Sequence, residues 1–197
     1  NQLKLTYTDS VGVLQCLDVL EFPVISNVEK NNYFTISQNK FKNLVNKVLF
    51  SVATDDSRPI LKGCLIEIEN KMIKTVALDG YRLAICNENL TESTSNFKIV
   101  VPARSLSEIS KMLNDSDDEI KVFLNMQNIM VDIGDTLIIS RLLEGDFINY
   151  RQIIHSQFAT TVTLSREQLD DAIDRASVLS ELETAISYLQ KNDSVNA

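Results

Sequence analysis

One order of predicted elements, a strand followed by a helix and further strands, occurs twice in succession in this sequence. The first copy opens with a strand at 33–36 and a helix whose apolar residues recur at helical spacing: Phe41, Leu44, Val45, Val48 and Leu49. The second copy opens with a strand at 97–100, and its helix has the apolar stripe Leu106, Ile109 and Leu113. Its closing strands are predicted at 120–124, 129–133 and 137–143. The duplication predicts an α+β domain with antiparallel sheets over residues 31–158.

The strands of the first copy are predicted from a hairpin pattern. Alternating apolar residues at 64–68 and 72–77 flank a turn at 69–71, and the dipeptide Asp79-Gly80 ends the pairing. We predict a third strand at 81–85, with Tyr81 and Leu83 on one face and Arg82 on the other. Ser37 precedes the first helix and is predicted to be its N-cap.

The ends of the chain resemble parts of further copies. V-T-L-S at 162–165 repeats F-T-I-S at 34–37, and Ser165 and Gln168 have the spacing of a capping box before an apolar stripe. A third copy is therefore expected over 159–197, truncated or divergent after Ser180. Residues 1–30 contain strand-like runs at 3–7 and 11–19 and lead into a polar segment at 27–32 that is typical of a linker. The first residue is Asn, which suggests a piece of a longer protein.

Charge is distributed unevenly along the chain. The formal net charge is −8, which argues against coating nucleic acid by bulk electrostatics. However, there is no acidic residue between Gln38 and Thr54. The polar face of the first helix carries Asn39, Asn43 and Asn46, flanked by Lys40, Lys42 and Lys47. On the second helix Arg104 and Lys111 are seven residues apart and nearly aligned. These faces are either solvated surface or a local patch for DNA.

No motif for catalysis or metal binding stands out. His155 is the only histidine and lacks converging partners, the acidic run at 114–119 lacks the glycine and glutamate of a calcium loop, and Asp55-Asp56 is typical of a loop. We expect no metal, no cofactor and no enzymatic activity. The three cysteines, Cys16, Cys64 and Cys86, are expected to be buried free thiols of a cytoplasmic protein, and no run suits a membrane span.

Several motifs together resemble one known family. R-P-I-L-K-G-C-L at 58–65 and V-A-L-D-G-Y-R-L-A at 76–84 are similar to the middle domain of the bacterial sliding clamp, the beta subunit of DNA polymerase III. Three further matches fall in the family's order along the chain: F-T-I-S at 34–37, V-P-A-R at 101–104 and L-L-E-G-D-F-I-N-Y-R at 142–151. The resemblance implies a DNA-clamp fold with two helices on one face of the sheets, and it implies that residues 1–30 are the end of a first clamp domain plus a linker. It also implies a homodimeric ring of three-domain protomers that encircles double-stranded DNA without sequence preference.

The resemblance also implies functional residues. The residues expected to face DNA are Lys40, Lys47, Arg104 and Lys111. The middle-domain wall of a groove for short peptide motifs of the polymerase III catalytic subunit and the clamp loader matches Arg58, Leu61, Leu78, Gly80, Tyr81, Arg82, Leu83, Ile148, Gln152 and Ile153. Leu78, Ile148 and Gln152 replace the Thr, Pro and Arg that are common in the family, so the wall is more apolar or less cationic. The dimer seam is expected to include Val178 and Leu179.

Two functions remain open at this point. The first is a processivity factor that encircles DNA and tethers a polymerase. The second is a truncated, free-standing adaptor that binds clamp-motif peptides without encircling DNA. This polypeptide by itself is expected to be a monomer or an irregular associate, unless it is part of a longer protein, because ring closure in the family needs complete flanking domains.

Overall fold

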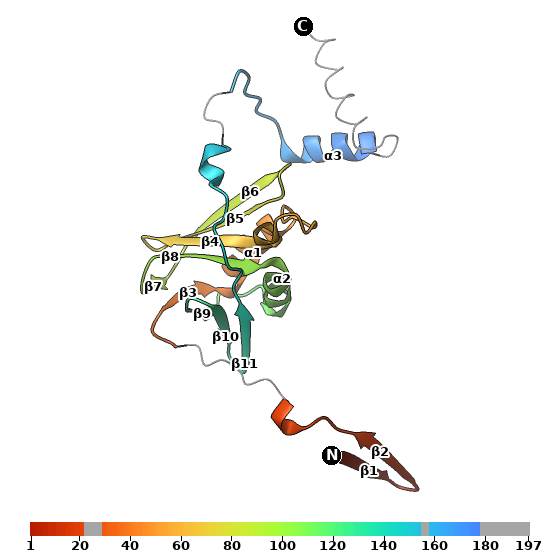
Figure 1. Ribbon diagram of the computed structural model, residues 1–197. Helices are drawn as coiled ribbons and strands as arrows, with labels where there is room; N and C mark the ends of the chain where they lie inside the picture. The colour runs from red at the N-terminus through yellow and green to blue at the C-terminus, as the bar shows by residue number, and fades with distance from the viewer. Residues whose placement is uncertain (22–28, 155–157, 178–197) are drawn as a thin grey trace. The chain divides into compact units, whose positions relative to one another are not determined.

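The computed structural model describes residues 1–21, 29–154 and 158–177 and divides into two compact units, 1–148 and 149–197. Each unit is described by itself. The first unit contains both predicted copies of the strand, helix and strands (Figure 1). Among the described residues, no helix combines the length and apolar character needed to cross a membrane.

The two copies are built from equivalent elements. The first consists of β3 (Tyr33–Ser37), α1 (Gln38–Leu49), β4 (Gly63–Glu69), β5 (Met72–Leu78) and β6 (Leu83–Asn89). The second consists of β8 (Phe97–Pro102), α2 (Ala103–Met112), β9 (Glu119–Leu124), β10 (Asn128–Ile133) and β11 (Thr136–Arg141). The short strand β7 (Glu92–Ser93) lies between the copies, and the short helix η2 (Pro59–Lys62) precedes β4.

Each copy gives its first strand to the sheet of the other copy. One sheet has the order β6-β5-β4-β8, and the other has the order β11-β10-β9-β3-β7, with antiparallel pairing throughout. Hence β8 extends the meander of the first copy, while β3 extends that of the second. The predicted duplicated α+β architecture is confirmed.

A single large core lies between the two helices and the inner faces of the sheets. The predicted helical stripes are buried: Phe41, Leu44, Val45 and Val48 on α1, and Leu106 and Ile109 on α2, with Leu113 just beyond its end. The inner face of β4 contributes Cys64, Ile66 and Ile68. Because these three alternate with residues that point the other way, β4 also has a buried outer face, where Leu65 is 1% exposed.

The third strand of the first copy begins later than the sequence predicts. β6 starts at Leu83, and residues 79–82 form a turn in which the Asp79 carboxylate accepts hydrogen bonds from the backbone N–H groups of Tyr81 and Arg82. The side chain of Asp79 thus holds the backbone away from strand pairing. The predicted alternation of Tyr81 and Arg82 across a strand was wrong.

The cap of α1 also differs in mechanism from the prediction. Ser37 occupies the N-cap position, but its side chain makes no capping hydrogen bond, and its buried Oγ has no partner among the described residues. Instead, the N–H groups of Gln38 and Asn39 donate to the carbonyls of Asp118 and Ser116 at 2.9 and 3.0 Å. The loop after α2 therefore supplies acceptors to the first turn of α1.

The N-terminal segment is an antiparallel hairpin of β1 (Gln2–Tyr7) and β2 (Ser10–Gln15), followed by the short helix η1 (Val19–Glu21). The second strand is shorter than the predicted run at 11–19. The strand ends at Gln15, and the Asp18 carboxylate accepts the N–H of Leu20 within η1. All three cysteines are free as predicted, but only Cys64 is buried; Cys86 is half-buried and Cys16, in the hairpin segment, is exposed.

The second unit contains the short helix η3 (Tyr150–Gln152) and α3 (Arg166–Ser177). Helix α3 begins directly after Ser165, whose carbonyl accepts the N–H of Leu169 at 3.1 Å. Residues 162–165 form no strand, although their counterpart at 34–37 does. His155, Val178 and Leu179 lie outside the described residues.

Candidate functional site

A segment of extended chain crosses the outer face of the four-stranded sheet after β11. We call residues 142–147 the strap. The N–H of Leu143 donates to the carbonyl of Val100 on β8 at 2.9 Å, which attaches the strap to the edge of the sheet. Further along, Phe147 is buried and lines the same cavity as Leu65 of β4. The strap therefore covers the apolar outer face of the sheet, and it ends where the predicted wall residue Ile148 begins.

Gly63 provides the space in which the strap packs. A Cβ atom at this position would lie 2.8 Å from Cδ1 of Leu143, 2.9 Å from Cγ1 of Val100 and 2.6 Å from the carbonyl oxygen of Val101. Such separations are too short for any side chain. Gly63 belongs to the motif at 58–65 and Leu143 to the motif at 142–151. The two motifs thus meet in three dimensions.

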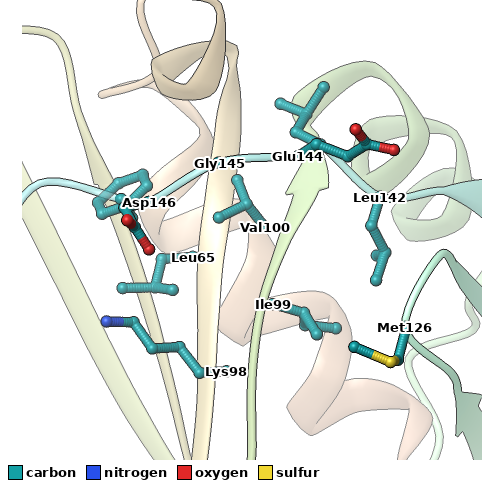
Figure 2. Close-up of a pocket in the computed structure, with 11 residues that line it drawn as sticks. Leu65, Lys98, Ile99, Val100, Met126, Leu142, Glu144, Gly145 and Asp146 are labelled. Carbon is teal, nitrogen blue, oxygen red and sulfur yellow. The ribbon is translucent and has the colours of Figure 1, made fainter.

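A cavity of about 310 Å³ remains between β8 and the strap. Figure 2 shows Val100 and Leu65 below the strap, with Lys98 and Asp146 toward one end and Met126 toward the other. Glu144 and Asp146 are exposed carboxylates at its rim, and Lys98 is an exposed cation. None of the predicted peptide-binding residues lines this cavity.

The predicted peptide-binding wall lies partly at the junction of β5 and β6. Leu78 and Leu83 are cross-strand partners, Leu78 being buried and Leu83 half-buried. Leu61, in η2, is buried as well. Ile85 follows two positions after Leu83 on the same face of β6 and is 38% exposed. Ile85 is not among the wall residues expected from the sequence, although the strand alternation on either side of Ala84 predicts that it shares the face of Leu83.

The turn before β6 presents three more wall residues to solvent. Gly80 has a φ of +98°, which favours glycine, and Tyr81 is fully exposed. The Arg82 guanidinium pairs with the Asp79 carboxylate at 2.8 Å and lies 6.0 Å from the centre of the Phe50 ring. The hydrogen bond from the N–H of Tyr81, together with those from Arg82, lowers the pKa of Asp79 below its usual value. Asp79 is therefore the residue that organises this turn.

The remaining wall residues belong to other segments of the chain. Arg58 is exposed just before η2, and Ile148 is half-buried at the end of the first unit. Gln152 and Ile153 belong to the second unit, where both are exposed.

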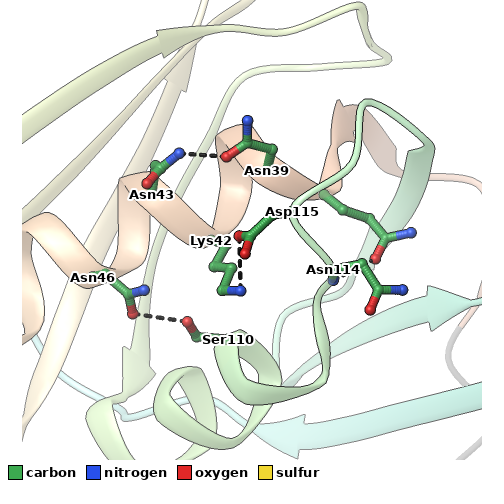
Figure 3. Close-up of polar contacts among 8 residues, drawn as sticks. Asn39, Lys42, Asn43, Asn46, Ser110, Asn114 and Asp115 are labelled. Carbon is green, nitrogen blue, oxygen red and sulfur yellow. Dashed lines mark hydrogen bonds and ion pairs between the residues drawn. The ribbon is translucent and has the colours of Figure 1, made fainter.

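The two helices form the second candidate site and are joined by polar contacts (Figure 3). Ser110 of α2 donates to Asn46 of α1 at 2.7 Å. Lys42 pairs with Asp115 at 2.8 Å, and the N–H of Asn114 donates to Gln38 at 2.9 Å. These contacts fix α1 against α2 and the following loop. Lys42 and Asn46 therefore help to hold α1 against α2 and the loop that follows it.

The four cations predicted to face DNA are all exposed, but they differ in their partners. Lys40 pairs with Glu88 of β6 at 3.4 Å, and Lys111 pairs with Glu108 of α2 at 2.9 Å. Lys47 and Arg104 form no ion pair with any described residue. The partner carboxylates were not singled out from the sequence. Glu108 could have been found by its helical spacing from Arg104 and Lys111, whereas Glu88 comes from a distant strand.

The carboxylates considered for metal binding have other roles in the loop before η2. Asp55 accepts hydrogen bonds from the N–H and the hydroxyl of Ser57, which lower the pKa of Asp55, and Asp56 pairs with Lys62. Within residues 1–21, 29–154 and 158–177, no group of three or more His, Cys, Asp or Glu side chains is arranged to hold a metal ion.

Comparison with known proteins finds a matching family profile and similar curated proteins. The profile of the DNA polymerase III beta subunit, central domain, matches residues 35–149. The beta sliding clamp of Escherichia coli K12 is 31% identical over 167 residues, which are 85% of this chain and 46% of the relative. The beta sliding clamp of Staphylococcus epidermidis is 29% identical over 179 residues, or 91% of this chain and 48% of the relative.

Solved structures agree with these relatives. The DNA polymerase sliding clamp from Bacillus subtilis has a TM-score of 0.85 and 27% identity, covering 92% of this chain and 48% of that one. A DNA polymerase III beta subunit structure from Eubacterium rectale has a TM-score of 0.83 and 29% identity. The chain spans about half the length of the curated relatives that it matches.

Proposed function

Because this chain belongs to the DNA polymerase III beta subunit family, we propose that it is the central part of a sliding clamp, a non-catalytic processivity factor of DNA replication. In this proposal the complete protein is a cytoplasmic homodimeric ring around double-stranded DNA. It tethers the DNA polymerase III catalytic subunit and the clamp loader through short peptide motifs. The family match over more than half of the chain is the observation that carries the proposal.

The paired helices suit a surface that must attract DNA without reading it. Lys40 and Lys47 on α1, and Arg104 and Lys111 on α2, are exposed and lie two helical turns apart within each pair. Such cations attract phosphates regardless of base sequence, and base contacts would pin a ring that has to slide. We infer that these four residues face the duplex.

The wall at the start of β6 suits an apolar peptide anchor. Leu83 is half-buried beside the buried Leu78, so an added side chain can cover apolar surface there without opening the core. Arg82 is exposed next to it and is held by Asp79, so its guanidinium is oriented before a peptide arrives. We infer that Leu78, Arg82 and Leu83 contact partner peptides, with Arg58, Leu61, Gly80, Tyr81, Ile148, Gln152 and Ile153 completing the wall.

Titration of a fluorescent peptide tests the groove. The peptide contains the Gln and Leu-Phe residues that the family prefers, and its anisotropy is followed on addition of this chain. We expect saturable binding that is lost in Leu83→Asp. The matched control is Leu137→Asp on β11. Leu137 is also a half-exposed leucine, but it belongs to the five-stranded sheet, whereas Leu83 belongs to the four-stranded sheet. Equal binding by both variants would contradict the assignment of the wall, and binding only by a longer chain would assign the groove to the complete clamp.

A further inference from the structure

Two of the four cations that are proposed to face DNA already form ion pairs with carboxylates of this chain. Lys111 holds Glu108 at 2.9 Å, and Lys40 holds Glu88 at 3.4 Å. The Lys111 pair is well exposed, with 66% of the lysine side chain and 60% of the glutamate side chain accessible. An exposed pair of this kind contributes little to stability. Stabilisation of the fold therefore does not explain why Glu108 lies beside Lys111.

Glu108 lies between the two cations of α2. It follows Arg104 by four residues and precedes Lys111 by three, so all three side chains project from the same ridge of the helix. Hydrogen bonding and charge attraction from Lys111, with a further contribution from Arg104, lower the pKa of Glu108. Near neutral pH a glutamate carboxylate is ionised, and this one is paired with one of the two cations on the ridge that would attract a phosphate group.

We propose that Glu108 is an internal competitor for phosphate that limits how strongly the helix ridge holds duplex DNA, with Glu88 acting in the same way on Lys40. This inference rests on the proposed function, because it assumes that the ridge faces DNA. A phosphate can take full advantage of Lys111 only when Glu108 is displaced, and the displaced carboxylate then repels the phosphate. Each contact becomes an exchange of one anion for another, which leaves a shallow energy profile along the duplex.

The test compares DNA binding by Glu108→Gln and the unchanged chain over a range of salt concentrations. A fluorescein-labelled duplex of about 30 bp is titrated by anisotropy between about 50 and 200 mM NaCl. Freeing Lys111 for one additional phosphate should steepen the slope of log K against log salt by about 0.9. The affinity ratio of variant to unchanged chain should then fall about 3.5-fold between those two concentrations.

Glu69→Gln is the matched control. It removes the same charge from the outer face of β4, which points away from the helices, so it reports only the change in net charge. A second control is a double-mutant cycle with Lys111→Gln. If Glu108 acts by occupying Lys111, the gain from Glu108→Gln should shrink when Lys111 is absent.

The outcomes separate this inference from the proposed function. If Glu108→Gln binds DNA no better than Glu69→Gln, or gains equally without Lys111, the competitor role is overturned. If Arg104→Gln and Lys111→Gln also leave DNA binding unchanged, the ridge does not face DNA, and the assignment of the DNA-facing residues fails as well. If Arg104→Gln lowers the affinity for DNA while Glu108→Gln leaves it unchanged, only the competitor role is overturned.

Discussion

Replacing Gly63 with alanine should destabilise the first unit, because this position joins the sheet to the strap. The added methyl group would meet three atoms closer than 3.0 Å, and they belong to Val100, Val101 and Leu143. The side chains of Val100 and Leu143 can adjust. The carbonyl oxygen of Val101, 2.6 Å away, belongs to the backbone of the neighbouring strand β8 and cannot move without disturbing the pairing with β4.

The size of the effect follows from two opposing contributions. Forcing a methyl group into a filled site costs about 1–3 kcal/mol, and a backbone contact favours the upper part of that range. Alanine recovers about 0.5–1 kcal/mol relative to glycine within a strand, because it restricts the unfolded chain. The expected net loss in the free energy of unfolding is about 1.5–2.5 kcal/mol.

Urea denaturation followed by far-UV circular dichroism measures this loss. Gly12→Ala on β2 is the matched control, since a Cβ atom there would have no neighbour within 4 Å, and it should leave stability unchanged or raise it by up to about 1 kcal/mol. In a double-mutant cycle, Gly63→Ala and Leu143→Ala together should cost less than the sum of the two single changes, because one of the three close contacts is absent without the Leu143 side chain. A Gly63→Ala chain as stable as the Gly12→Ala chain would refute the argument that this glycine is required for strap packing.

Three further expectations concern single side chains. Ser37→Ala should change the unfolding free energy by less than about 0.5 kcal/mol, rather than the ~1 kcal/mol of a working cap, because its Oγ makes no capping hydrogen bond; urea denaturation measures this. The lowered pKa of Asp79 means that its stabilisation is present above its unfolded pKa and is lost as pH falls through its folded pKa. Asp79→Asn should therefore differ more from the unchanged chain in urea midpoint at pH 7 than at pH 3, and an equal difference at both would contradict this. Burial raises the pKa of the Cys64 thiol to about 12, so at pH 8 a disulfide reagent should modify exposed Cys16 quickly and Cys64 only after urea is added.

The sequence predicts those parts of the fold that depend on local periodicity. Both helices appear at the expected positions, because apolar residues such as Phe41 and Leu106 repeat at helical spacing; these residues are buried apart from Leu49, which is half-buried. The hairpin of β4 and β5 also follows the prediction, and its turn residues Asn70 and Lys71 both have positive φ. In contrast, the start of β6 was misplaced, because one side chain, Asp79, bonds to the backbone and overrides the alternating pattern.

The candidate sites were less predictable, since they depend on contacts between distant residues. The basic residues of the helices could be identified from the sequence, but the sequence did not reveal how much of their charge is neutralised by nearby carboxylates. Lys40 meets Glu88, which lies 48 positions away in sequence, and this pairing follows only from how β6 packs beside α1. Glu108 needed no long-range information, yet a search for cations alone passes over it. Counting acids together with bases on each helix face would have shown a ridge that is partly self-neutralised.

The exchange of first strands explains why the duplication acts as one domain. β3 forms no pair with β4, β5 or β6 of its own copy, and β8 forms none with β9 or β10 of its own copy. Each copy alone would leave a strand without partners and a helix with half of its core missing. The strap strengthens this dependence, because it leaves β11 of the second copy and packs over Gly63 of the first. The predicted peptide-binding wall at Leu78 and Leu83 belongs to that same sheet face, so it should be disturbed by any change that separates the copies, even one far from the wall in sequence.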